Sequence, residues 1–251
     1  MVKRVVYLAV AVGLVGMGIW LSRELGTVQI WLFGMGLAGL VGISAEGFLE
    51  RSTIHQTDNH RQLFGLWIAP TLLVAAGLWL AQSMPLDALV GVAGSMAGLM
   101  AVLLLGLRAG MNPAGHFSRP GRFAVNLVLY LLVFLLLALI YHTRERSLIT
   151  AAFVGAVSLV AALELLRTSD GIQPPTWRFA GLAAMVMAET TWGLNYWPME
   201  GLVGSAMLLL TFYVLVGLLT AIRDGRMDRR MLAEYCTVGA VGLATIIWAM
   251  P

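Results

Sequence analysis

Apolar stretches of about 20 residues alternate with short charged or turn-forming breaks along almost the whole chain. A helix of about 20 apolar residues crosses the hydrocarbon core of a bilayer. Backbone groups inside hydrocarbon must be paired within the segment, so each stretch is predicted to be helical. The pattern therefore predicts an all-α polytopic transmembrane bundle of about nine helices, at residues 5–22, 28–48, 63–82, 88–107, 123–141, 148–166, 179–197, 202–222 and 231–250.

The lengths of the breaks predict how these helices pair. Short connections follow the first, third, fifth and seventh helices, and longer ones follow the second, fourth, sixth and eighth. Helices joined by short connections usually pack as antiparallel neighbours. We therefore expect four hairpins followed by a lone ninth helix, all within a single integral membrane domain, residues 1–251.

Basic residues are distributed unevenly over the breaks. Of 16 Lys and Arg residues, 13 fall at the N-terminus and in the longer connections, while Arg23, Arg144 and Arg146 fall in the short ones. Positive charge is retained on the cytoplasmic side of membrane proteins. The distribution predicts a cytoplasmic N-terminus, an external C-terminus and a multi-pass protein of the plasma (cell inner) membrane.

The composition agrees with this picture and excludes a soluble globular protein. Hydrophobic residues make up 59% of the chain and charged residues 12%, about half the usual charge of a soluble domain. The formal net charge of +3 is explained by the orientation signals, so no nucleic-acid partner is expected. A single cysteine, Cys236, excludes an internal disulfide and a cysteine-based metal cluster. The expected partners are the lipid bilayer and either another membrane protein or further copies of the chain.

One acidic residue lies deep within a predicted span. Glu189 follows Arg178 by 11 residues, which places it about 16 Å along the helix and near the membrane midplane. Trp192 and Tyr196 share its helical face, and Asn195 lies nearby. An intramembrane carboxylate is costly unless it faces protein or water. The four residues form a predicted ligand-binding site in which charge and aromatic faces would hold a cation. A structural hydrogen bond from Glu189 to a neighbouring helix is the alternative.

A second group of polar residues lies at the cytoplasmic end of the second helix and in the loop after it. Glu46 and Glu50 lie one turn apart, and the loop supplies His55, Asp58 and His60. Carboxylates and imidazoles of this kind bind zinc or non-haem iron. A divalent metal site is one hypothesis, although the spacing matches no metal-binding motif. A solvated loop with compensating charges is the other.

Further charged residues suggest local roles. Arg119 and Arg122 occupy a glycine-containing cytoplasmic loop and would bind an anionic head group, or would serve as orientation signals alone. Glu164 precedes Arg167 by three residues, and Glu234 follows Arg230 by four. Both spacings predict ion pairs within a helix.

Three functions remain open from the sequence. The first is a non-catalytic membrane subunit or ligand-binding protein with a midplane carboxylate at Glu189. The second is a small-molecule or ion transporter that uses Glu189, and the third is a lipid-modifying enzyme built on the cytoplasmic Glu/His/Asp group. Familiar catalytic motifs such as HExxH, GxSxG and the Walker loop are absent from the sequence. The sequence therefore favours a protein that is not an enzyme, and its cofactors stay unknown.

Overall fold

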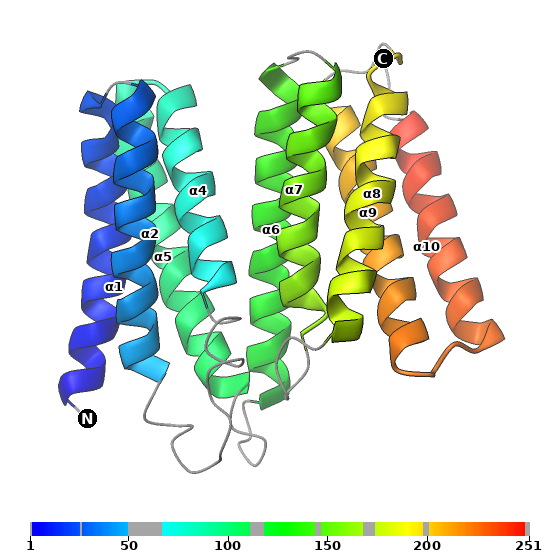
Figure 1. The fold of residues 1–251 in the computed structure, drawn as a ribbon, viewed down its shortest axis with the longest axis horizontal. Coiled ribbons are helices and arrows are strands. Elements are labelled where there is room, and N and C mark those ends of the chain that lie inside the picture. The colour runs from blue at the N-terminus through cyan, green and yellow to red at the C-terminus, as the bar shows by residue number, and fades with distance from the viewer. Residues whose placement is uncertain are drawn as a thin grey trace. The chain divides into compact units, whose positions relative to one another are not determined.

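The structure is a computed structural model that describes residues 2–25, 27–49, 67–110, 118–143, 147–167, 174–197 and 201–248. Within these ranges the chain forms nine α-helices and no strands (Figure 1). A short 3-10 helix, η1 (Ser22–Glu24), follows the first of them. The α-helices are α1 (Val2–Leu21), α2 (Thr27–Leu49), α4 (Ile68–Ser83), α5 (Leu86–Gly110), α6 (Ser118–Thr143), α7 (Ser147–Leu165), α8 (Pro174–Leu194), α9 (Gly201–Arg223) and α10 (Arg229–Trp248).

Each helix overlaps one of the nine predicted segments, so the all-helical prediction is confirmed. Seven helices in the described residues are long and apolar enough to cross a membrane, which is compatible with a membrane protein; these are α1, α2, α5, α6, α7, α9 and α10. Helix α8, predicted as a span, is not among these seven. The apolar helix α4 has 16 residues, and the start of its predicted segment lies outside the described residues. Insertion into a membrane and the orientation of the termini stay predictions.

The prediction was least accurate for α8. This helix begins at Pro174 and ends at Leu194, whereas the predicted segment covered 179–197. Two prolines, Pro174 and Pro175, occupy its first turn. Proline fits there because the first N–H groups of a helix have no partner within it. The proline pair is therefore the start of the helix rather than a break before it.

The chain divides into two compact units, Met1–Leu132 and Val133–Pro251, with the boundary inside α6. In the first unit α1 packs against α2, α4 and α5, and α4 packs against α2 and α5. Ile19, Leu73 and Met100 are fully buried between these helices. The predicted hairpins α1–α2 and α4–α5 are therefore both present as packed pairs.

In the first unit the side chain of Arg23 binds the end of α4. The Nη1 group of Arg23 donates to the carbonyl oxygens of Ala81, at 3.3 Å, and Met84, while Gln82 Nε2 donates to Ser22 O at 3.1 Å. The last carbonyls of a helix have no partner within it, so Arg23 satisfies groups at the end of α4. This role explains why an arginine occupies a connection that is otherwise poor in basic residues.

In the second unit the closest packing is between α7 and α8, which belong to two different predicted hairpins. Helix α9 packs against α7, α8 and α10. Figure 1 shows α10 beside α9, the helix that precedes it along the chain. The Nη1 group of Arg223, at the end of α9, donates to Leu166 O just after α7. An arginine thus binds carbonyls at the end of a neighbouring helix in this unit too.

Candidate functional site

The site begins with the close packing of α7 on α8. Gly155, near the middle of α7, lies so close to α8 that an added Cβ would sit 3.3 Å from both Ala184 O and Ala188 Cβ. Small residues of this kind let two helix backbones approach each other. Because Ala188 precedes Glu189, this contact fixes the level of Glu189 along the pair.

Hydrogen bonds hold the C-terminal end of α8 against α6 and α7. Tyr141 Oη donates to Leu194 O at 3.2 Å, and Asn195 Nδ2 lies 3.5 Å from Ser147 O, at the start of α7. Glu189 lies six residues before Asn195, which is about 9 Å along a helix axis. The carboxylate is therefore well inside the apolar length of α7, between its middle and the end that begins at Ser147.

The two faces of α8 differ sharply in exposure. The side chains of Ala180, Ala183, Met187 and Thr191 are fully buried. On the other face, residues at alternating spacings of four and three are exposed, and we call this set the α8 face. Its members are Arg178, Leu182, Met185, Glu189, Trp192 and Tyr196.

Glu189 lies at the centre of the α8 face with its carboxylate exposed. Trp192 is 55% exposed and Tyr196 77% exposed, so both rings are free to contact another molecule. All three residues are exposed, and Tyr196 follows the last residue of α8, Leu194, by two positions. A carboxylate followed along the face by two exposed aromatic rings is suited to a cationic group, because the charge and the ring faces both attract it.

Asn195 does not belong to this face. Its side chain is half-buried and its amide is directed to Ser147 O. A position six residues after Glu189 is rotated about 120° from it around the helix, which takes Asn195 off the face. The asparagine joins the ends of α7 and α8 instead.

The predicted metal site falls almost entirely outside the described residues. Glu50, His55, Asp58 and His60 lie there, so the structure says nothing of them. Glu46 is described and is half-buried in α2. Among the described residues no group of three or more His, Cys, Asp or Glu side chains is placed to hold a metal ion. The metal hypothesis stays a prediction.

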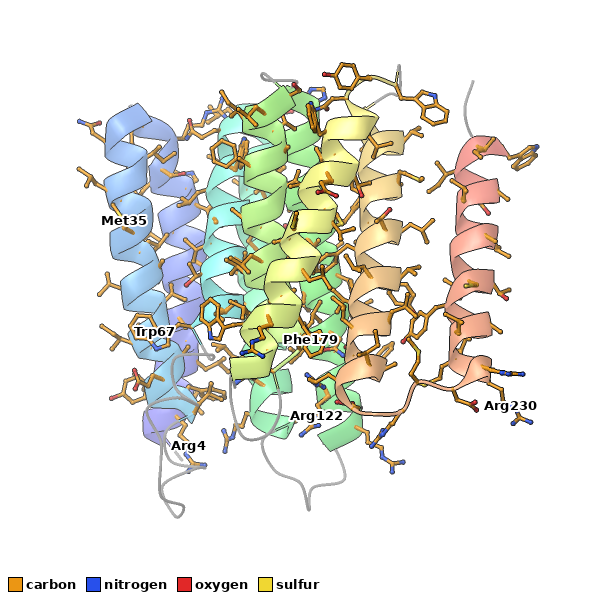
Figure 2. The ribbon with its side chains drawn as sticks, turned by 45° about the vertical axis from the view of Figure 1, so that its right-hand side comes forward. Arg4, Met35, Trp67, Arg122, Phe179 and Arg230 are labelled. Atoms are coloured by element: carbon orange, nitrogen blue, oxygen red, sulfur yellow. The ribbon has the colours of Figure 1, made fainter. Side chains whose placement is uncertain are left out.

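The two arginines predicted to bind an anionic head group lie in the first turn of α6. Arg119 and Arg122 are both exposed, three residues apart and so on one face of that turn. Arg122 is labelled at the end of α6 in Figure 2. The prediction placed them in a loop, whereas they extend the helix beyond the predicted start at residue 123. Both stay available to an anionic group.

One of the two predicted ion pairs forms. Arg167 Nη2 and Glu164 Oε1 lie 2.7 Å apart at the end of α7, as predicted. Arg230 and Glu234 form no ion pair with each other in the described part of α10, and both are exposed. The prediction for α10 was therefore wrong. A pair between the exposed Arg230 and Glu234 would add little stability, because solvent screens both charges.

Sequence reasoning missed the roles of Arg23 and Arg223. Both bind backbone carbonyls at the end of another helix, and such a contact depends on which helix is the neighbour. The signal in the sequence was weak: Arg23 lies in a connection that is otherwise poor in basic residues. Arg223 gave no signal, because it follows the general excess of arginine at one end of the helices.

The chain belongs to the family described as "Protein of unknown function (DUF5656)", whose model matches residues 7–249. No curated protein and no solved structure matches the chain.

Proposed function

We propose that this protein is a non-catalytic integral membrane subunit that binds a second membrane protein through the α8 face. The observation that carries the proposal is the exposed carboxylate of Glu189 at the centre of that face, well inside the apolar length of the neighbouring helix α7. A buried Glu189 would support a role within the fold. An exposed one supports a role in contact with another molecule.

The free-energy cost of an unpaired carboxylate in a membrane supports the proposal of a partner protein. An ionised side chain in the hydrocarbon costs about 2.5 kcal/mol or more unless it finds a partner. No ion pair of the described residues includes Glu189, whereas Glu164, on the apolar helix α7, is paired with Arg167. A partner from outside the chain would remove this cost.

The chemistry of the face indicates the kind of partner. Glu189 would accept from a Lys, Arg or His side chain, and Trp192 and Tyr196 would flank that cation with their rings. Leu182 and Met185, 48% and 62% exposed, continue the face with apolar contacts. The repeat of four and three is the spacing along which one helix packs on another. The partner is therefore a transmembrane helix with one basic residue, since a single helix face would surround a free cation on one side only.

The proposal is tested with a photoreactive residue in intact membranes. Met185 is replaced by a photoreactive phenylalanine derivative, which lies one turn from Glu189 and leaves the carboxylate in place. We expect one protein adduct of defined mass, and we expect Glu189→Gln to lower its yield at least about tenfold, because a charge-assisted contact contributes about 1.5–3 kcal/mol.

Two matched controls separate the α8 face from general exposure. The same photoreactive residue at Phe153, which is 47% exposed on α7, should label lipid instead of that protein. Asp87→Asn removes an exposed carboxylate at the start of α5 and should leave the Met185 adduct unchanged. An adduct that survives Glu189→Gln at full yield, or labelling of lipid alone from Met185, would overturn the proposal.

A further inference from the structure

Helix α10 contacts the rest of the second unit along one face only. A Cβ added to Gly217 of α9 would lie 2.3 Å from the Tyr235 ring, and one added to Gly242 of α10 would lie 2.7 Å from the Leu210 side chain. These glycines form the spaces into which Tyr235 and Leu210 fit. No residue of α10 is buried, so the faces away from α9 are uncovered.

The face of α10 opposite these contacts is made of small residues beyond Arg230, which lies at its first turn. Ala233, Thr237, Ala240 and Ala244 follow one another at spacings of four, three and four, and all are exposed. At 100° per residue they lie on the far side of the helix from Tyr235 and Gly242. Helices in membranes associate where small residues let their backbones approach, because lipid gives little apolar driving force between large side chains.

Charges beside this face identify the second helix. Arg229 and Glu234 flank opposite edges of it, five residues apart, and both are exposed. In a parallel pair of identical helices, a residue on one edge faces the residue five positions later on the other helix. Arg229 of each copy would then face Glu234 of the other, which gives two equivalent ion pairs.

Neither Arg229 nor Glu234 takes part in an ion pair among the described residues, so both are available to a second chain. The two ion pairs join Arg167 with Glu164 and Arg223 with Asp224. Figure 2 shows Arg230 at the end of α10 that is joined to α9. The predicted pair between Arg230 and Glu234 does not form, so the carboxylate of Glu234 stays open to a second chain.

We infer that a second copy of this chain docks on α10 to form a parallel two-fold dimer. Copies that insert by the same charge rule share one orientation, so their symmetry axis runs along the membrane normal and their α10 helices are parallel. The interface is the small-residue face from Ala233 to Ala244, flanked by the pairs of Arg229 with Glu234. This inference uses α10 alone and does not rest on the role proposed for Glu189.

Cysteine cross-linking in intact membrane vesicles tests the inference. Cys236 is the only cysteine and is exposed, so Cys236→Ser gives a cysteine-free chain. A disulfide requires Cα atoms about 4.4–6.8 Å apart. On oxidation, Ala240→Cys and Ala244→Cys in that background should yield a covalent dimer. Leu232→Cys and Val238→Cys should stay monomeric, although these two positions are 46% and 39% exposed.

Charge exchange provides a second readout that a folding defect would not reproduce. In the Ala244→Cys chain, Glu234→Arg should lower the yield of dimer, because it places Arg229 opposite another arginine. Adding Arg229→Glu should restore the yield, since each pair then has opposite charges again. Equal cross-linking at all four cysteine positions, no dimer from Ala240 and Ala244, or no restoration in the double exchange would overturn the inference. Binding of α10 to a different protein would appear as the second of these results.

Discussion

Helices α7 and α10 belong to the same unit and are both apolar enough to span a membrane, yet their surroundings differ. Half of the apolar length of α7 is buried inside the protein, whereas none of the apolar length of α10 is. Both helices carry small residues. In α7 these residues bring α8 within contact distance, as Gly155 does, whereas in α10 Ala240 and Ala244 are exposed.

The comparison separates two uses of similar sequences. Gly155 contributes to the fold of one chain, because its contact partner is α8. Ala240 and Ala244 of α10 and Glu189 of α8 are instead exposed, so they are accessible to other chains. Changes at the α7–α8 contact should therefore lower the stability of the chain, and changes on the exposed faces should alter assembly without lowering that stability.

The largest expected effect is on the α7–α8 contact. Gly155→Leu places a side chain where a Cβ already meets Ala184 O and Ala188 Cβ at 3.3 Å. Overpacking of this kind costs about 1–3 kcal/mol, and a backbone oxygen cannot move aside easily. We expect a loss of about 3 kcal/mol in the free energy of unfolding in detergent, followed by circular dichroism. A loss below 0.5 kcal/mol, the ordinary range of a surface change, would contradict the packing described.

The next effect concerns the hydrogen bond at the end of α8. Tyr141 is 3% exposed and its hydroxyl donates to Leu194 O at 3.2 Å. Tyr141→Phe removes the donor, keeps the ring and leaves a buried carbonyl without this partner. We expect a loss of about 1 kcal/mol in the same unfolding measurement. The matched control is Tyr196→Phe, whose hydroxyl is on an exposed residue, and an equal loss in both variants would refute the distinction.

Glu189→Leu should act in the opposite direction. In the isolated chain the carboxylate faces detergent rather than protein, so an apolar side chain of similar size fits the surroundings better. We expect the free energy of unfolding to rise by about 1 kcal/mol, a fraction of the cost of a charged residue in hydrocarbon. Destabilisation by more than 1 kcal/mol would show that Glu189 contributes to the fold of this chain.

The smallest effect is expected on α10. Ala240→Leu adds bulk to an exposed face, so the unfolding free energy of the monomer should change by less than about 0.5 kcal/mol. The measurement is made at a dilution where the chain is monomeric, and Gly155→Leu is the buried counterpart. A loss comparable to that of Gly155→Leu would place Ala240 inside the fold and contradict the comparison of the two helices.

The sequence predicted the helices well because their signal is local. A run of about 20 apolar residues between charged breaks is sufficient to indicate a helix, and all nine predicted segments carry one in the described residues. The predicted segment for α8 began just after Arg178, whereas the helix begins at Pro174. Helical spacing alone predicts that Glu189 and Trp192 share a face, and both are exposed on α8.

The packing could not be predicted in the same way. Glycines and alanines occur in most of the apolar segments, so the sequence does not show that Gly155 meets α8 while Ala244 is exposed. The contacts of Arg23 and Arg223 with carbonyls depend on the neighbouring helix, which lies 57 to 61 residues away along the chain. Whether Glu189 faced a cavity or the outside was likewise a property of the assembled helices.

The most direct test of the role of Glu189 is the yield of the adduct from a photoreactive residue at Met185 in intact membranes. With Glu189 present, one protein of defined mass should be labelled, and Glu189→Gln should reduce that yield at least about tenfold while the purified chain stays folded. An unchanged adduct in the Glu189→Gln chain, or lipid as the only labelled molecule, would contradict the proposal that the α8 face binds a membrane partner.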